Sequence, residues 1–354
     1  MTERDQRPES GGLTAIVLAC CAVGAVAVGV AFYGPPLSLS GSSGASASAN
    51  ASADKSAPPA PTSASAPASP SALRAKGPDY ATEEYGRQLV AHTAELMGPD
   101  HPDPERRMIG SRLNCGSCHL GTGTEPGTLN LLQTFEHYPR FSGRAGTMTD
   151  IEDRINECMQ RSMNGTPLPM DSPEMIAIAA YLRGLGTQYQ AMGASRRRAE
   201  EPPPFKTPQR AASVENGGKV FESRCAICHG KDGQGLLATG DKIKGYLFPP
   251  LWGPDSFNDG AGMHRVLTAS RFIKARMPLG EPTLTDDEAF DVAAFINDQP
   301  RPQMANLEKD YPDPAAKPVD NPYGPFADDF PVEQHRFGPF QPIEDHYKAR
   351  KKTK

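Results

Sequence analysis

The sequence predicts an all-α protein built from two similar domains in tandem. The pentapeptide pattern Cys-x-x-Cys-His occurs twice in the 354 residues, at 115–119 and at 225–229. The same signals surround each copy in the same order: a helix, the pentapeptide, a loop-rich stretch, and a final helix that is apolar on one face. This repetition indicates one fold used twice.

The pentapeptide has a specific chemistry. Two thiols at this spacing add across the vinyl groups of a haem, and the adjacent imidazole binds its iron. The sequence therefore predicts two covalently attached haem c groups, with His119 and His229 as axial iron ligands. The attaching thiols are those of Cys115, Cys118, Cys225 and Cys228. The alternative is a single four-cysteine zinc site, which leaves both histidines without a role and requires two distant cysteine pairs to meet.

The first domain is predicted over residues 78–195. Its opening helix spans Thr82–Met97, and its closing helix runs through Leu185. Ser172 is the expected N-cap of the closing helix, because a serine there is followed by Pro173 at the first helical position.

The second domain is predicted over residues 209–302. Ala212–Arg224 is its opening helix, and a capping box from Thr285 to Glu288 starts a closing helix that runs through Asn297. Each domain thus has the element order of a class I cytochrome c domain.

Two segments connect and follow these domains. Residues 196–208 combine an arginine run with a proline run and are predicted to form a charged, stiff linker. Residues 303–354 are rich in proline and in aromatic side chains, which predicts an ordered strap lying on the domains rather than a disordered tail. The basic end, 348–354, is interpreted as a frayed, solvated terminus.

The N-terminal residues 1–34 contain an uncharged apolar run, Leu13–Tyr33, close to the ~20 residues that a helix needs to cross a bilayer. This predicts a membrane anchor, with a cleaved signal peptide as the alternative. Residues 35–77 are almost all Ser, Ala, Pro and Gly and are predicted to be a flexible tether. Because haem is attached outside the cytoplasm, the domains are expected on the periplasmic side of a bacterial inner membrane, or free in the periplasm after cleavage.

The charge of the chain excludes one class of partner. The formal net charge is −5, and the chain has no extended basic stripe of the kind that binds nucleic acid. Nucleic acid binding therefore has no electrostatic support.

The second haem needs a further axial ligand, and Met277 is the candidate. It precedes Pro278, which ends a helix and aims the methionine side chain, while Met263 is a rival close upstream. The segment Pro249–Gly253 resembles one that packs over the proximal side of a haem, where a proline carbonyl orients the histidine.

No Met-Pro loop occupies the matching place in the first domain. A capping box from Thr149 to Glu152 instead opens a helix that carries Cys158. Of the seven cysteines, only this one lies outside the haem motifs and the apolar run. At about 100° per residue it falls between an apolar stripe and a cationic stripe formed by Arg154 and Arg161.

Such a thiol can face a haem, with the arginines bordering an anion site. The alternative is an ordinary solvated face held by two i,i+4 pairs, Asp150 with Arg154 and Glu157 with Arg161, beside an inert cysteine. The residues alone leave both interpretations open.

Several segments resemble the thiosulfate dehydrogenase family of diheme cytochromes. The resemblance covers most of residues 80–345 and is carried by the stretches at 154–165, 168–169, 171–175, 272–280, 291–302 and 317–342. It implies oxidation of two thiosulfates to tetrathionate, with Cys158 as distal ligand of the first haem and site of the chemistry. It also implies that Arg144 lines the substrate pocket and that Met277 binds the second iron.

One position departs from this pattern. Some relatives carry a lysine immediately before the methionine, which can replace it on the iron, whereas this chain has Arg276. A guanidinium does not deprotonate and so does not readily bind iron. Ligand exchange at the second haem is therefore not expected.

The ligands also predict the direction of electron flow. An anionic thiolate lowers the potential of a haem and a thioether raises it, so electrons should run from the first haem to the second. They would then pass to an external cytochrome c or another respiratory acceptor. Two other interpretations remain, a diheme electron carrier without a substrate and a sulfur carrier resembling the Sox cytochromes.

Overall fold

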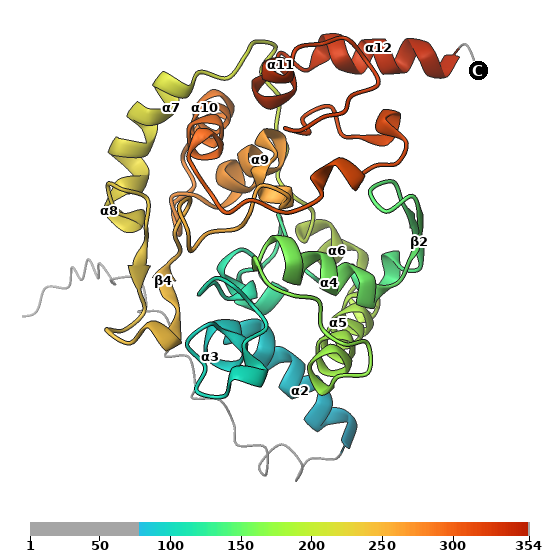
Figure 1. The fold of residues 1–354 in the computed structure, drawn as a ribbon, viewed down its shortest axis with the longest axis vertical. Helices are drawn as coiled ribbons and strands as arrows, with labels where there is room; N and C mark the ends of the chain where they lie inside the picture. Colours follow the sequence, from blue (N-terminus) through green and yellow to red (C-terminus); the bar gives the residue numbers. More distant parts are fainter. Residues whose placement is uncertain (1–77, 353–354) are drawn as a thin grey trace, which may run out of the picture. The chain divides into compact units, whose positions relative to one another are not determined.

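A computed structural model describes residues 78–352 of the chain (Figure 1). The predicted membrane segment at 13–33 and the tether at 35–77 lie outside these residues. Within the described part, no helix combines the length and the apolar character needed to span a bilayer.

The first haem-motif region runs from the opening helix to the closing helix. Its elements are α2 (Pro78–Ala91), α3 (Thr93–Met97), β1 (Arg140–Ser142), β2 (Thr147–Thr149), α4 (Ile151–Arg161) and α5 (Pro173–Ala191). The short helix α6 (Ala194–Ala199) follows, so the arginines assigned to a linker are helical.

The second region repeats the order. Its elements are α7 (Val214–Val220), α8 (Ala226–His229), β3 (Leu236–Leu237), β4 (Tyr246–Phe248), α9 (Val266–Arg276) and α10 (Asp286–Asp298). In Figure 1, α7, α9 and α10 are drawn from yellow to orange, and α2 to α5 from blue to green.

Opening and closing helices meet through a glycine in both regions. A Cβ on Gly86 of α2 would lie 1.9 Å from the carbonyl oxygen of Ala177 on α5. A Cβ on Gly217 of α7 would lie 2.0 Å from the carbonyl oxygen of Asp291 on α10. No real side chain tolerates such distances, so glycine allows the two backbones to touch. The shared close approach confirms that one fold is used twice.

Each region has its own apolar core. Leu89, Met175 and Leu185 are almost completely buried in the first, and Leu284 and Phe290 in the second. Burial of such side chains contributes about 1.5–3 kcal/mol each. These cores hold the helices that carry the two haem motifs.

The opening helices are more broken than predicted. In the first region the helix is interrupted at His92, whose ψ of 40° is not helical. The interruption lets Thr93 turn toward the haem motif, where its hydroxyl accepts a hydrogen bond from the backbone nitrogen of Cys115 (3.0 Å). In the second region α7 ends at Val220, and a single π turn over Phe221–Cys225 leads into α8.

The prediction of an all-α fold is wrong in one respect, because two short antiparallel hairpins are present. Strand β1 pairs with β2, and β3 pairs with β4. The strands have two or three residues each, too few for the period-2 pattern by which a strand is recognised in a sequence.

Helix starts follow the predicted chemistry with one exception. The hydroxyl of Ser172 caps α5, and Thr285 and Glu288 form the reciprocal capping box of α10. At α4 the predicted box is displaced by one residue, because the N-cap is Asp150 and the carboxylate of Asp153 returns to its backbone nitrogen (2.9 Å).

The C-terminal segment is ordered, as predicted. It contains α11 (Val332–Phe337) and α12 (Gln341–Lys352), and Phe340 and Ile343 are buried in the second core. We call residues 303–340 the strap. The interpretation of the basic end as frayed is wrong for 348–352, because these residues continue α12 and Lys348 pairs with Glu344 (3.1 Å).

Candidate functional site: two haem sites and a cysteine

The first haem motif lies in a tight turn after α3. Its Cys115 begins a one-turn 3₁₀ helix, and the side chain of Asn114 accepts a hydrogen bond from the first turn of α3. The Nδ1 atom of His119 lies 2.7 Å from the carbonyl oxygen of Leu129 and donates to it. Burial lowers the pKa of His119, so the imidazole is neutral and its Nε2 is left for a metal.

The second motif ends a helix, and its histidine is fixed in the same way. The Nδ1 atom of His229 donates to the carbonyl oxygen of Pro249 at 2.8 Å. The sequence predicted a proline carbonyl from this segment, and the contact confirms it. The corresponding acceptor in the first region, Leu129, was not predicted, because no local motif distinguishes the residue.

The residues present fit haem at both places. All four motif cysteines are free, so each thiol can form a thioether. Each imidazole is oriented by a carbonyl and presents its second nitrogen. In addition, Nε of Arg276 and Nε and Nη1 of Arg301 are enclosed donors without a protein acceptor in the described part, and haem carboxylates are suitable partners for such donors.

A single zinc site with four thiols does not match this arrangement. Cys115 packs against the first core and Cys225 against the second. Among the described residues, no three His, Cys, Asp or Glu side chains gather in a metal-binding group.

Cys158 lies on α4 next to the first haem motif. Ile151 and Ile155 of the same helix are buried at 5 % and 6 % exposure, while the thiol is free and partly accessible. Burial is the main cause that raises the pKa of Cys115 and Cys118, and the charge of Cys158 raises both further. The thiol therefore lies within electrostatic reach of both attachment sites.

Arg154 is the arginine most closely associated with this thiol. The charge of Cys158 is the largest cause that raises the pKa of the Arg154 guanidinium. The guanidinium also contacts the carboxylate of Glu157 (3.2 Å) and keeps 38 % of its side chain accessible. It is thus a cation beside the thiol that an incoming anion can reach.

The other two predicted arginines converge on Asp310 of the strap. Arg161 donates two hydrogen bonds to its carboxylate, each of 2.8 Å, and is 8 % exposed. Arg144 lies 3.9 Å from the same carboxylate, with its guanidinium 5.8 Å from the ring centre of Tyr311. The alternative interpretation required pairs of Asp150 with Arg154 and of Glu157 with Arg161. Instead, Arg154 pairs with Glu157 and Arg161 pairs with Asp310. Accessibility and pairing rank Arg154 first, Arg144 second and Arg161 last as anion ligands.

Tyr138 is a site residue that the sequence analysis missed. Burial raises the pKa of its hydroxyl, and the charges of Arg154, Glu157 and Cys158 all act on it. The ring therefore lies beside the α4 thiol, and its phenol is protonated. A lone tyrosine before a proline gives no signal in a sequence, so only the fold could reveal it.

Met277 follows the last residue of α9, with its backbone nitrogen bonded to Ile273 (2.8 Å). Met277 and its rival Met263 both pack against the second core. The role of Met277 as iron ligand therefore stays a prediction.

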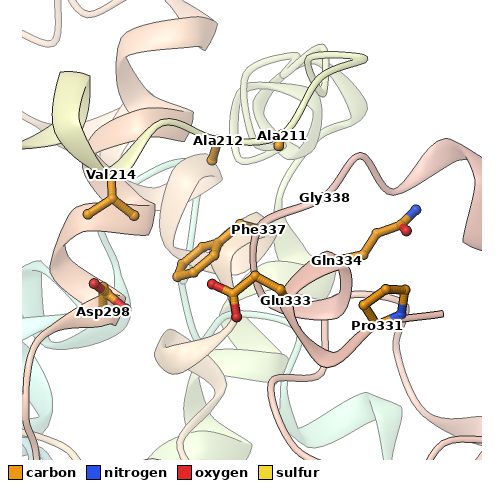
Figure 2. A pocket seen from close by; sticks show the side chains of 9 residues that line it. All are labelled: Ala211, Ala212, Val214, Asp298, Pro331, Glu333, Gln334, Phe337 and Gly338. Atoms are coloured by element: carbon orange, nitrogen blue, oxygen red, sulfur yellow. The ribbon is translucent and has the colours of Figure 1, made fainter. Parts of the chain in front are cut away.

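One surface cavity of the described part lies apart from both haem motifs. It has a volume of about 460 Å³ and lies between α7, α10 and α11, lined by Val214, Asp298, Glu333 and Phe337 among others (Figure 2). None of the predicted site residues lines it.

Comparison with known proteins agrees with this architecture. Residues 106–189 match the family model described as SoxA/TsdA, cytochrome c domain. Residues 212–296 match the model described as cytochrome c oxidase, cbb3-type, subunit III. The protein is therefore a diheme c-type cytochrome with two cytochrome c domains.

Three similar proteins identify the family within this class of cytochromes. The chain is 39 % identical to the thiosulfate dehydrogenase of Allochromatium vinosum over 222 residues, which are 61 % of this chain and 77 % of that protein. It is 38 % identical to that of Psychrobacter arcticus over 64 % of this chain, and 41 % identical to that of Stutzerimonas stutzeri over 56 %. The chain belongs to the thiosulfate dehydrogenase family.

A solved structure, thiosulfate dehydrogenase (TsdBA) from Marichromatium purpuratum in its as-isolated form, is also similar. Its TM-score is 0.56 at 33 % identity, and the match covers 65 % of this chain and 48 % of that one. The chain spans 65 % and 63 % of the lengths of the Psychrobacter and Stutzerimonas relatives.

Proposed function

We propose that this protein oxidises two thiosulfate ions to tetrathionate, with the chemistry at Cys158. The observation that carries the proposal is a free thiol on α4, beside the first haem motif, with an accessible guanidinium next to it. Thiosulfate is a dianion with a soft sulfur at one end and a sulfonate at the other. A thiol and a guanidinium fork side by side are complementary to those two ends.

In the first step, Arg154 is the main ligand of the sulfonate and Arg144 the second. Together they direct the outer sulfur toward Cys158. A bond forms between the Cys158 sulfur and that sulfur as two electrons leave, which gives a cysteine S-thiosulfonate. Haem iron, when bound, supplies the one-electron acceptors for this oxidation. The protonated hydroxyl of Tyr138 is a neutral donor for a sulfonate oxygen.

In the second step, the outer sulfur of another thiosulfate attacks the S-thiosulfonate. The new sulfur–sulfur bond completes tetrathionate, and Cys158 leaves as a thiolate, ready for the next cycle. The step consumes no proton, because an S-thiosulfonate monoanion and a thiosulfate dianion give a tetrathionate dianion and a thiolate. The guanidinium groups offset the repulsion between the two reacting anions. Net transfer is two electrons per tetrathionate.

Electrons leave through the second domain to an external cytochrome c or another respiratory acceptor. Support comes from the different candidate ligands, a thiolate in the first domain and a thioether at Met277 in the second. We further propose that the enzyme works on the periplasmic side of the inner membrane, held there by residues 13–33 or released by their cleavage. The reverse reaction, tetrathionate reduction, uses the same groups.

The proposal is tested by thiosulfate-dependent reduction of ferricyanide with tetrathionate quantified, in the wild type and in Cys158→Ala. Covalent loading of both haems is verified first in each protein. We expect one tetrathionate per two electrons from the wild type and none from the variant. A wild type that reduces no ferricyanide with thiosulfate would be an electron carrier, and one that retains sulfur on Cys158 without releasing tetrathionate would be a sulfur carrier.

A further inference from the structure

Arg276 connects the two domains at the position where the second haem's candidate ligand begins. It is the last residue of α9 and directly precedes Met277. Its Nη2 atom donates to the backbone carbonyls of Glu125 (3.0 Å) and Pro126, both in the first domain. Only 12 % of the Arg276 side chain is exposed, although the carbonyls that it contacts lie in an exposed loop.

The loop that receives Arg276 is the one that orients the first histidine. Three residues beyond Pro126, the carbonyl of Leu129 accepts the hydrogen bond from His119. Leu129 has a φ of 63°, which a leucine adopts only when its surroundings hold it there. Its side chain packs against the core of the second domain.

These contacts form one continuous path between the two sites. It runs from Met277 to Arg276, across the boundary to Glu125 and Pro126, and through Leu129 to His119. The carbonyl that orients the first haem's histidine is therefore held in place from the second domain. The side chain that holds it is covalently next to the second haem's candidate ligand.

We propose that Arg276 is a positioning residue that couples the ligand sets of the two haems. It fixes the Leu129 carbonyl on His119 from one side and the Met277 loop from the other. The proposal deepens the proposed function, on which it rests for the passage of electrons from the first haem to the second. Its test needs no thiosulfate, so it succeeds or fails separately from the proposed reaction.

The coupling predicts potential shifts of opposite sign in Arg276→Gln. A carbonyl on Nδ1 makes an imidazole a stronger electron donor, so loosening that bond raises the potential of the first haem. Loosening the Met277 loop weakens thioether ligation and lowers the potential of the second haem. Simple loss of a positive charge would instead lower both potentials, because a nearby cation favours the reduced iron.

The experiment is a spectropotentiometric titration of the holoprotein, with the near-infrared bands of both ferric haems recorded. The matched control is Lys244→Gln, which breaks another ion pair across the boundary, to Glu95 (2.5 Å), and removes a positive charge without changing Arg276, Met277 or the loop that it contacts. We expect the first haem to shift upward and the second downward in Arg276→Gln, and neither to move in the control. A first-haem potential that stays constant or falls would overturn the proposal.

Leu129→Ala provides a second test that changes no charge and remains available if Arg276→Gln does not load both haems. The substitution removes the packing of the loop on the second core while leaving the carbonyl in the chain. We expect an upward shift at the first haem and, through the loosened Arg276 contact, a weaker thioether band at the second. A change confined to the first haem would contradict the coupling.

Discussion

Helices α4 and α9 occupy the same place in their domains, yet they present different chemistry. Each has 11 residues and lies between the haem motif and the closing helix. Cys158 is three residues before the end of α4, whereas the equivalent position in α9 is the buried Ile273, and Met277 comes only after the helix ends. Moving the sulfur from loop to helix places it among the charges of α4.

The side chains that surround the two helices also differ in charge. Around α4, the guanidinium groups of Arg144, Arg154 and Arg161 share the two carboxylates of Glu157 and Asp310. The inward face of α9 is apolar, with Leu267, Phe272 and others in the core. A surplus of positive charge suits a domain that binds anions, and an apolar shell suits one that only relays electrons. This difference in charge is what the proposed division into a reaction site and an electron exit requires.

The last arginine of each helix nevertheless makes the same kind of contact. Arg161 donates to Gly260 of the second domain (3.4 Å), and Arg276 donates to Glu125 of the first (3.0 Å). Each helix therefore ends in a guanidinium that reaches the other domain's backbone. The comparison separates what differs, the sulfur and its charges, from what is shared, the attachment between domains.

The largest loss of stability is expected from neutralising the carboxylate by which the strap binds α4 or α9. Asp310 binds Arg161 at the end of α4, and Asp320, 1 % exposed, binds Arg265 at the start of α9 (2.9 Å). Breaking a buried ion pair by neutralising one partner costs about 3–5 kcal/mol. Asp310→Asn and Asp320→Asn should each lower the free energy of unfolding by about that amount, measured with urea.

Only Asp310→Asn should also change turnover, because only this carboxylate engages Arg144, which holds the sulfonate in the proposed reaction. Equal losses of activity in Asp310→Asn and Asp320→Asn, after correction for the folded fraction, would contradict the proposed difference between α4 and α9.

The next effect concerns the cation beside the thiol. Arg154→Gln should lower kcat/KM for thiosulfate by about ten- to a hundred-fold, since a hydrogen bond to a charged group contributes about 1.5–3 kcal/mol. Arg144→Gln should lose less, because Asp310 already engages that guanidinium. The control is Arg271→Gln on the exposed side of α9, which should leave the kinetics unchanged. A normal kcat/KM in Arg154→Gln would remove this residue from the proposed site.

A smaller loss of stability, equal in both domains, is expected from removing the helix caps. Ser172→Ala and Thr285→Ala remove the hydroxyls that cap the closing helices α5 and α10. Each should cost about 1 kcal/mol of stability, and neither should alter the spectrum of either haem. Different spectral responses would mean that the two frameworks are not equivalent.

The smallest effect is a pH dependence at the α10 cap. Hydrogen bonds from the backbone and hydroxyl of Thr285 hold the pKa of Glu288 below its ordinary value of 4.5. A lowered carboxyl pKa stabilises the fold above the unfolded pKa, and this contribution is lost as pH falls through the folded pKa. When the pH is lowered from neutral to below 4.5, the free energy of unfolding should therefore fall less in Glu288→Gln than in the wild type. Identical acid dependence would contradict the assignment.

Much of this molecule was predictable because its chemistry is local. The haem motifs, the caps at Ser172 and Thr285, and the Pro249 carbonyl all depend on residues close in sequence or on one recurring segment. The placement of Cys158 between an apolar and a cationic stripe was also predictable, because helical periodicity fixes it.

The missed features are contacts between distant segments. Asp310 lies 149 residues from its partner Arg161, and local spacing favoured Glu157 instead. Leu129 is chosen as the acceptor for His119 by the path of a loop, and Arg276 reaches the first domain through tertiary packing. Periodicity gives the face of a helix but not what covers that face, so the partners of α4 and α9 emerged only from the fold.

The most direct test of the account is to measure the reduction potentials of the two haems in the wild type, each assigned by its ferric near-infrared and electron paramagnetic resonance signature. We predict a thiolate-ligated first haem with the lower potential and a thioether-ligated second haem with the higher one. A first haem with the higher potential, or the same ligation at both irons, would contradict it.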